Sequence, residues 1–381
     1  MFSNIISDEL AQVRRKQESA ALKGLSPEDL SADRSHPFNE RILDAVLDPR
    51  LGTDEVWMKT AVESFQQLRR SRWQDKVFAI APLYVTSFCV EQCLYCNYRA
   101  GNRGIDLERR RLSDEQLESE VDFLIGRGIR VIELVYATDP KLDVDSISHQ
   151  IRVVHKLLSR VGGGLVGINA EPFTTLEYKP LVDAGLDFAV LWQETYDPEC
   201  YSRVHVGKTK KVNYEFRLDG VERMIAAGVP HVGLGVLSGL GDWRTDWYLL
   251  LRHICYLQDE LGVQPSILGI PRMRDAAGAA LHDIQHVPSN LTFEMLVNLA
   301  MAYCPDTRPF VNTRENWDMC MALSRGGGNL FTFNCSTIPG GYSLGATGYQ
   351  FPTFSFDLDN AGPRATAEGL NVQLDWRFDQ P

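Results

Sequence analysis

Three cysteines stand close together in this sequence. Cys89, Cys93 and Cys96 fall within eight residues, directly after the apolar run Val77–Thr86. Three thiolates on a loop that leaves a strand can converge on one metal centre. A structural zinc ion normally takes four protein ligands, and no fourth Cys or His lies nearby in the sequence. Three thiolates instead suit a [4Fe–4S] cluster in which one iron stays open.

An open iron can bind the amino and carboxylate groups of S-adenosylmethionine and pass one electron to its sulfonium. The products are methionine and a 5′-deoxyadenosyl radical, so the cofactors carry the hard chemistry. Two alternatives stay open from the residues alone: a zinc ion completed by a distant ligand, and three buried cysteines without a metal. The other five cysteines stand singly and are interpreted as small buried hydrophobes.

The elements that must position this loop are predicted from eight short apolar runs. Helical periodicity separates them, as in Asp114–Arg127 and Val221–Gly228. Strands of this kind alternating with helices predict a parallel sheet covered on both faces. A closed (β/α)8 TIM-type barrel fits the count, and an open doubly wound sheet is the alternative. The runs are Val77–Thr86, Val131–Ala137, Leu165–Ala170, Phe188–Gln193, His231–Leu237, Ser266–Ile270, Pro309–Thr313 and Leu330–Asn334.

Three regions are expected along the chain. Residues 1–75 are rich in Glu, Arg, Leu and Ala and predict an N-terminal helical extension. Residues 76–345 hold the barrel. Residues 346–381 contain Pro, Gly and Asp with little periodicity, so a loop-rich C-terminal cap is expected there.

The charge and the apolar content of the chain limit the kinds of binding partner that are expected. The 381 residues carry a net charge of −11, which argues against a nucleic-acid surface. The one compact basic run, Arg109-Arg110-Arg111, is expected on a solvated surface. The first residues lack the basic and apolar regions of a signal peptide, and no apolar run reaches the roughly 18 residues that span a bilayer. A cytoplasmic protein without a membrane partner is therefore expected.

The spacing Cys-x3-Cys-x2-Cys is the signature of the radical S-adenosylmethionine superfamily, and the chain resembles that superfamily over roughly residues 70–345. Within it, the chain is similar to the aromatic amino acid lyases, which include 2-iminoacetate synthase and the nosiheptide tryptophan lyase. The stretches that carry this resemblance are Pro82-Leu83-Tyr84, Gln193-Glu194-Thr195-Tyr196, Gly233-Leu234-Gly235, Thr313-Arg314-Glu315 and Pro339-Gly340-Gly341-Tyr342.

The resemblance implies catalytic roles at the substrate. Arg314 follows the seventh strand, at the barrel mouth, and resembles the arginine that clamps the substrate α-carboxylate. Its alternative is a surface arginine paired with Glu315. Tyr84 resembles a tyrosine near the substrate amine, and plain packing is its alternative. Thr332 stands where relatives place a hydroxyl near the substrate, with Ser336 as a nearby competitor.

The resemblance also implies contacts to the cofactor. Glu194 and Arg217 look like side chains that face the methionine end of S-adenosylmethionine, and pairing only with protein is the alternative for each. Tyrosine lyases carry Gly-Glu after the second strand, where this chain has Thr138-Asp139. Either residue is expected to accept a hydrogen bond from the cofactor ammonium.

The implied activity is cleavage of a carbon–carbon bond at the α-carbon of a free aromatic amino acid, with a flavodoxin or ferredoxin-type reductant. The departures from the tyrosine lyases, at Thr138-Asp139 and at Asn97-Tyr98 after the last cluster cysteine, count against the enzyme of the thiamine pathway. By elimination among the relatives, L-tryptophan and 3-methyl-2-indolate formation are expected. The alternatives are a tyrosine lyase that gives p-cresol and dehydroglycine, and a radical enzyme with another substrate. A non-catalytic zinc-binding barrel is the alternative of a different class.

Overall fold

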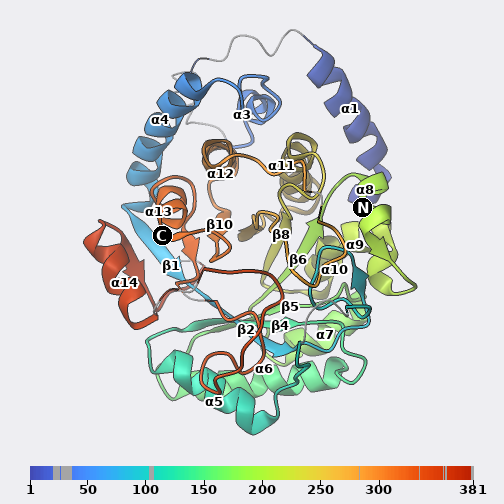
Figure 1. Cartoon of the computed structure of the whole chain (residues 1–381), viewed down its shortest axis with the longest axis vertical. Coiled ribbons are helices and arrows are strands. Elements are labelled where there is room, and N and C mark those ends of the chain that lie inside the picture. Colours follow the sequence, from blue (N-terminus) through green and yellow to red (C-terminus); the bar gives the residue numbers. More distant parts are fainter. Residues whose placement is uncertain are drawn as a thin grey trace.

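A computed structural model describes residues 1–19, 26, 37–102, 107–282, 284–333, 335–354, 356 and 358–378. Figure 1 shows strands at the centre of the molecule with helices around them. All eight predicted strands are present, although Asn334, the last residue of the eighth run, lies outside the described residues.

The strands follow one another in sequence order around the sheet. The first run is split into β1 (Lys76–Ala79) and β2 (Ala81–Thr86). β1 pairs with the last barrel strand, whereas β2 pairs with the second, so the sheet curls round to its own first strand. A doubly wound sheet would reverse its strand order, so that alternative is wrong and the TIM-type barrel is confirmed. The other strands are β4 (Val131–Tyr136), β5 (Leu165–Asn169), β6 (Phe188–Glu194), β8 (His231–Val236), β9 (Ile267–Gly269), β10 (Arg308–Val311) and β11 (Leu330–Phe331).

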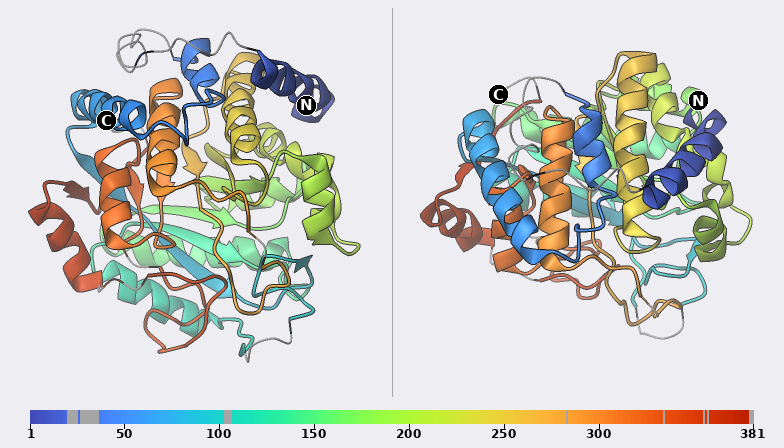
Figure 2. Two further views of the ribbon diagram at one scale, coloured as in Figure 1. Left: turned by 45° about the horizontal axis from the view of Figure 1, so that its top comes forward. Right: turned by 90° about the horizontal axis from the view of Figure 1, so that it is seen from above.

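Helices surround this sheet on its outer face, as the views in Figure 2 show. Capping side chains fix several of their first residues; Ser113 and Gln116, for example, form a capping box at the start of α5. The helices are α5 (Asp114–Ile125), α6 (Val144–Ser159), α7 (Thr175–Asp183), α8 (Pro198–Val204), α9 (Tyr214–Leu218), α10 (Gly220–Ala227), α11 (Trp243–Leu261), α12 (Asn290–Tyr303), α13 (Trp317–Arg325) and α14 (Leu358–Ala367).

The first 75 residues are helical in their described parts. A short 3-10 helix (Phe2–Asn4) precedes α1 (Ile6–Glu18), which packs on α11. α3 (Glu40–Ala45) and α4 (Glu55–Trp73) pack on α12. These helices therefore cover one side of the barrel wall.

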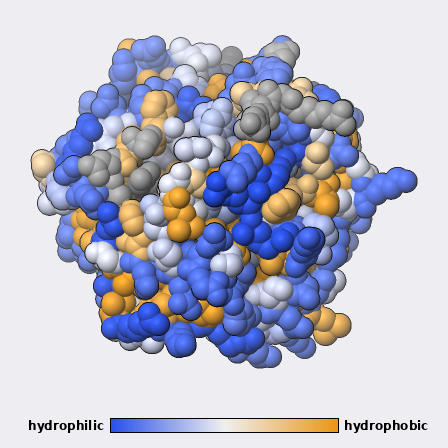
Figure 3. Space-filling model, turned by 60° about the horizontal axis from the view of Figure 1, so that its bottom comes forward, coloured by the Kyte–Doolittle hydropathy of each residue, from blue (hydrophilic) through white to orange (hydrophobic). Residues whose placement is uncertain are grey.

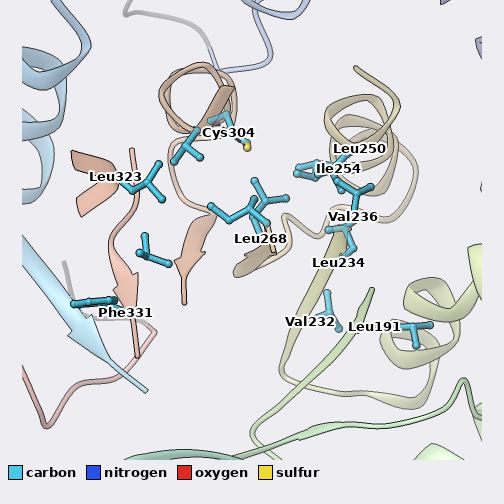
Figure 4. Packing of buried hydrophobic residues seen from close by; sticks show 14 of the residues in the cluster. Leu191, Val232, Leu234, Val236, Leu250, Ile254, Leu268, Cys304, Leu323 and Phe331 are labelled. Atoms are coloured by element: carbon cyan, nitrogen blue, oxygen red, sulfur yellow. Dashed lines mark hydrogen bonds between the residues drawn. The ribbon is translucent and has the colours of Figure 1, made fainter. Parts of the chain in front are cut away.

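The main core lies between the outer face of the sheet and the helices. Val232, Leu234 and Val236 alternate along β8; Leu234 and Val236 lie near Leu250 and Ile254 of α11, and Val232 lies farther along the strand, toward Leu191 (Figure 4). Each of these side chains is buried, and burying such a side chain contributes about 1.5–3 kcal/mol. The apolar runs that predicted the strands are thus explained by packing on this outer face.

A second hydrophobic cluster fills the lower end of the barrel interior, the end opposite the carboxyl ends of the strands. The C-terminal segment adds the strand β12 (Asn371–Gln373) beside β1. After it, Trp376 is buried and its indole Nε1 donates to the Ala79 carbonyl oxygen at 2.7 Å. Trp376 also packs on Phe78 and Phe378. Part of the segment expected to be a loop-rich C-terminal cap therefore closes the end of the barrel opposite the carboxyl ends of the strands.

The surface is mixed in character. Figure 3 shows one face that is mostly hydrophilic, with hydrophobic residues scattered among the polar ones. Among the described residues, no helix combines the length and the apolar character that crossing a bilayer requires.

Candidate active site at the carboxyl ends of the strands

A cavity of about 170 Å³ opens among the carboxyl ends of the barrel strands. Its walls come from the loop after β2, the ends of β4, β5, β6, β9 and β10, and the C-terminal segment near Gln350. Barrel enzymes place their active sites at this end of the strands. The cavity therefore has the position that the sequence predicts for the site.

The three cysteines line this cavity together. Cys93 is buried and lies on β3 (Gln92–Cys93), which pairs antiparallel with β7 (His205–Val206). Burial raises the pKa of the Cys89 thiol to about 11 and that of Cys96 to about 12, so binding to iron must displace their protons. Three thiols around one end of a cavity fit a cluster with three protein ligands.

Two cations lie beside these thiols. Burial raises the pKa of the Cys93 thiol, whereas the charges of Lys211 and Arg217 act in the opposite direction.

Across the described residues, no three His, Cys, Asp or Glu side chains converge as they would around a single metal ion. Thiolates around a cubane lie farther apart than around one ion because the irons and sulfides separate them.

The basic run 109–111 holds the cluster loop in place, which corrects the prediction of a solvated surface. The Arg109 Nη1 donates to the carbonyl oxygens of Ser87 at 2.6 Å and Tyr98 at 2.9 Å, one on each side of the cysteines. Arg111 donates two hydrogen bonds to a buried carboxylate, whereas Arg110 pairs with Glu108 in a more exposed position. Arg109 thus closes the loop that carries all three thiols.

Glu194, Arg217 and Lys211 form a buried charged cluster at the cavity wall. The Glu194 Oε1 lies 3.1 Å from Lys211 Nζ and 3.6 Å from Arg217 Nη2. Although burial opposes it, these two cations hold the pKa of the Glu194 carboxyl below its usual range. Glu194 also has a φ of +73°, a left-handed backbone that a side chain adopts only under constraint. All three residues line the cavity, and Lys211 was not predicted.

Of the two residues predicted after the second strand, the structure brings only Thr138 to the cavity. The Asp139 carboxylate accepts hydrogen bonds from the Arg111 guanidinium at 2.6 and 2.7 Å and from the Thr86 hydroxyl at 2.6 Å. Its oxygens are used within the protein, and Asp139 is absent from the described lining of the cavity. Its predicted contact with the cofactor is therefore corrected: the carboxylate anchors Arg111 beside the cluster loop.

Arg314 lines the cavity and is partly buried. It does not pair with Glu315, whose carboxylate is held by Arg272 and Arg274, so that alternative is wrong. The Arg314 Nη1 lies 3.4 Å from the Arg272 carbonyl oxygen, and Nε has no hydrogen-bond partner within the described structure. The guanidinium lies over the ring of Phe351. Burial lowers the pKa of the Arg314 guanidinium, whereas the nearby Tyr84 and Glu194 act in the opposite direction.

Of the other two residues predicted to contact the substrate, Tyr84 lines the cavity and Thr332 does not. Tyr84 lines the cavity, and its hydroxyl donates to Gln350 Oε1 at 2.8 Å. Thr332 is buried outside the described lining, with its backbone N–H bound to the Val311 carbonyl oxygen, so its predicted place at the substrate is corrected. Thr313 lines the cavity instead, and its buried hydroxyl lies beside the Cys335 thiol.

Several aromatic side chains line the cavity. Trp192, Phe310 and Phe351 line the cavity together with Tyr84. Gly269 leaves room for the Trp192 ring, because a Cβ at that glycine would lie 2.3 Å from it. Flat apolar walls of this kind bind an aromatic side chain well.

Comparison with known proteins agrees with this geometry. Residues 83–249 match the family model described as the Radical SAM superfamily. The chain is 27% identical over 325 residues to 2-iminoacetate synthase of Escherichia coli (strain K12), which covers 83% of this chain and 81% of that protein.

Two solved structures share the fold. The crystal structure of HydG, a maturase of the [FeFe]-hydrogenase, superposes with a TM-score of 0.80 and 25% identity, covering 97% of this chain and 76% of HydG. The structure of methylornithine synthase superposes with a TM-score of 0.72 and 18% identity, covering 90% of this chain and 97% of that one.

Proposed function

We propose that this protein, which belongs to a lyase-like family of the radical S-adenosylmethionine superfamily, cleaves a carbon–carbon bond at the α-carbon of a free aromatic amino acid. The superfamily uses a [4Fe–4S] cluster and S-adenosylmethionine. The family match spans all three cysteines, so the non-catalytic zinc-binding barrel has no support.

The observation that carries the proposal is the state of Arg314. The partly buried Arg314 guanidinium lines a cavity that it shares with several aromatic side chains, and among the described residues its side chain makes one hydrogen bond, the 3.4 Å contact from Nη1 to the Arg272 carbonyl oxygen. A charged group buried in this way is costly unless a ligand satisfies it, and a carboxylate is its best partner. A free aromatic amino acid supplies both the carboxylate and the ring.

Different residues of the chain would bind the cluster, S-adenosylmethionine and the substrate. Cys89, Cys93 and Cys96 would hold the cluster, and Glu194, Arg217 and Thr138 would bind the methionine end of S-adenosylmethionine. When bound, these cofactors would supply the radical chemistry for hydrogen-atom abstraction at the substrate amine. Arg314 would fix the carboxylate so that the amine stays in reach.

L-tryptophan, giving 3-methyl-2-indolate, is the substrate that we favour. The departure at 138–139 from the Gly-Glu of the tyrosine lyases supports it. The similarity to 2-iminoacetate synthase favours the second candidate, cleavage of L-tyrosine to p-cresol and dehydroglycine.

The test is anaerobic incubation of cluster-loaded protein with reductant, S-adenosylmethionine, and tryptophan or tyrosine in parallel. Formation of 5′-deoxyadenosine that depends on one amino acid, together with its product, is expected. If neither amino acid stimulates 5′-deoxyadenosine formation, the lyase proposal is wrong. Reconstituted protein should hold about four irons and absorb broadly at roughly 400 nm.

Enzymes of this superfamily act on a small molecule and need a reductant. We expect a flavodoxin or ferredoxin-type protein as the electron donor. Turnover supported by such a protein in place of a chemical reductant tests this expectation.

A further inference from the structure

A buried carboxylate lies deep in the cavity, away from the charged cluster already described. Glu133, on β4, lines the cavity and is only 2% exposed. Its Oε1 accepts a hydrogen bond from Asn169 Nδ2 at 2.9 Å, and Asn169 also lines the cavity. Among the described residues, no Lys, Arg or His forms an ion pair with Glu133.

The strand register sets the depth of this group. Tyr84, Val135 and Asn169 stand at one level, because β2, β4 and β5 pair them in register. Glu133 precedes Val135 by two residues, so both side chains point to the same face and Glu133 lies roughly 6–7 Å nearer the floor. Arg314 follows the end of β10 at the mouth. A ligand clamped by Arg314 would therefore extend its side chain toward Glu133.

The energetics favour a ligand that can donate a hydrogen bond. Burial raises the pKa of the Glu133 carboxyl to about 7, and the bond from Asn169 opposes this only in part. A carboxyl group with one protein donor at the end of an aromatic-walled cavity keeps acceptor capacity for a ligand. A ring without a polar atom would leave that capacity unused and would desolvate the group.

We propose that Glu133 is a specificity-determining residue that accepts a hydrogen bond from the ring N–H or O–H of the substrate, so that tryptophan or tyrosine is taken and phenylalanine is excluded. The proposal rests on the proposed function, because it takes a free aromatic amino acid as the ligand. A purely structural Glu133, present only to hold Asn169, is the competing explanation.

The Glu133→Gln variant separates the two explanations. Asn169 can still donate to the new amide oxygen, so the new amide nitrogen would face the cavity and present a donor in place of an acceptor. The indole N–H can only donate, whereas the phenol oxygen can also accept. The variant should therefore weaken tryptophan binding more than tyrosine binding.

The experiment measures dissociation constants by isothermal titration of the cluster-loaded protein with S-adenosylmethionine present, for L-tryptophan, L-tyrosine, L-phenylalanine and L-lysine. The wild type should bind at least one of tryptophan and tyrosine roughly tenfold or more tighter than phenylalanine. Glu133→Gln should lose roughly tenfold in tryptophan affinity, and Glu133→Met should bind phenylalanine as well as it binds tryptophan.

Glu120→Gln is the matched control, because Glu120 is equally buried but accepts hydrogen bonds from the backbone of Tyr342 and Ser343 outside the cavity. Its relative affinities for the four amino acids should equal those of the wild type. Circular dichroism and iron content establish that each variant is folded and loaded.

Three results would overturn the proposal: equal binding of phenylalanine by the wild type, an unchanged preference in both Glu133 variants, or lysine bound more tightly than every ring amino acid. A turnover assay distinguishes failure of the proposed lyase function from failure of the specificity role of Glu133. If the binding preferences hold but no ring amino acid stimulates 5′-deoxyadenosine formation, the lyase reaction is wrong and the specificity role stands.

Discussion

The guanidinium carbon of Arg314 lies 3.4 Å from the centre of the Phe351 ring. Arg314 follows a barrel strand, whereas Phe351 belongs to the C-terminal segment, which is tied to the mouth by a 2.7 Å bond from the Phe354 N–H to the Thr313 carbonyl oxygen. A guanidinium stacked on a ring keeps its N–H groups in the plane where a carboxylate can accept them. The C-terminal segment thus takes part in orienting the proposed clamp.

Replacing the ring should loosen that clamp. Phe351→Ala should raise the KM for the aromatic amino acid about fivefold to tenfold, since stacking of this kind contributes roughly 1 kcal/mol. The absorbance of the cluster should not change, because Asn97 beside the cysteines bonds to the carbonyl oxygens of Tyr349 and Gln350 and not to the Phe351 ring. Steady-state kinetics over a range of substrate concentrations measure the effect, and Phe351→Tyr should restore the KM.

Removal of the guanidinium should be far more severe. Arg314→Ala should lower product formation by roughly a hundredfold or more, because a charge-assisted bidentate contact and the placement of the amine are lost together. Arg314→Lys should recover little, since an ammonium cannot make the planar pair. Product analysis beside the cluster spectrum provides the measurement. Full turnover by Arg314→Ala would place the carboxylate clamp elsewhere.

The two neighbouring arginines of the basic run should behave differently. Arg109→Ala removes the donors that join Ser87 and Tyr98 across the cysteine loop, so reconstitution should yield less iron and weaker absorbance at roughly 400 nm. Arg110→Ala removes a side chain that pairs with the exposed Glu108 and should load normally. Iron per chain after identical reconstitution compares them. Equal loading would mean that the thiols hold the loop without Arg109.

Glu194 should matter for the cofactor. Glu194→Gln leaves Lys211 and Arg217 buried without their carboxylate, and breaking such a buried pair typically costs about 3–5 kcal/mol. Affinity for S-adenosylmethionine should fall roughly tenfold or more and thermal stability should drop. Equilibrium dialysis with the labelled cofactor tests this. Glu177→Gln is the control, because it breaks a more exposed pair with the adjacent Lys210.

The deep carboxyl also predicts a pH dependence of stability. The Glu133 pKa is about 7 in the folded chain against 4.5 ordinarily, so the folded state binds this proton more tightly. Its contribution to stability is greatest below about pH 4.5 and is lost as the pH rises through about 7. Glu133→Gln lacks this loss and should gain up to about 3 kcal/mol over the wild type between about pH 5 and pH 8.

Urea unfolding midpoints at about pH 5.5 and about pH 8, without substrate, measure that difference. Asp246, another buried carboxyl with a pKa of about 7, is present in both proteins and cancels. A stability difference that does not change with pH would show that Glu133 is well solvated.

The barrel and the cluster loop are readable from the sequence for physical reasons. Strands buried on both faces must be apolar throughout, so the eight runs are visible without any knowledge of their pairing. The three cysteines lie on one short loop, so spacing alone brings them together. Arg314 and Tyr84 stand at strand ends, where the fold itself directs them to the mouth.

The remaining site residues could not be read in the same way. Gln350 and Phe351 reach the cavity from a segment with no periodicity, and Lys211 lies in a lysine-rich stretch that resembles a solvated loop. Asp139 points away from the cavity although its neighbour Thr138 lines it, because a shift of one position beside a strand end turns a side chain to the other face. Local pattern does not fix such orientations; tertiary contacts do.

The lower end of the barrel also constrains how the chain folds. The first barrel strand finds its neighbours β11 and β12 only after some 250 to 300 further residues have been added, and Trp376 fills the interior last. Pairings so distant in sequence make ring closure slow, since the long intervening loop must first be ordered. During synthesis on the ribosome, the early strands and the cysteine loop therefore exist as an open, incomplete sheet until β11 is available to pair with β1.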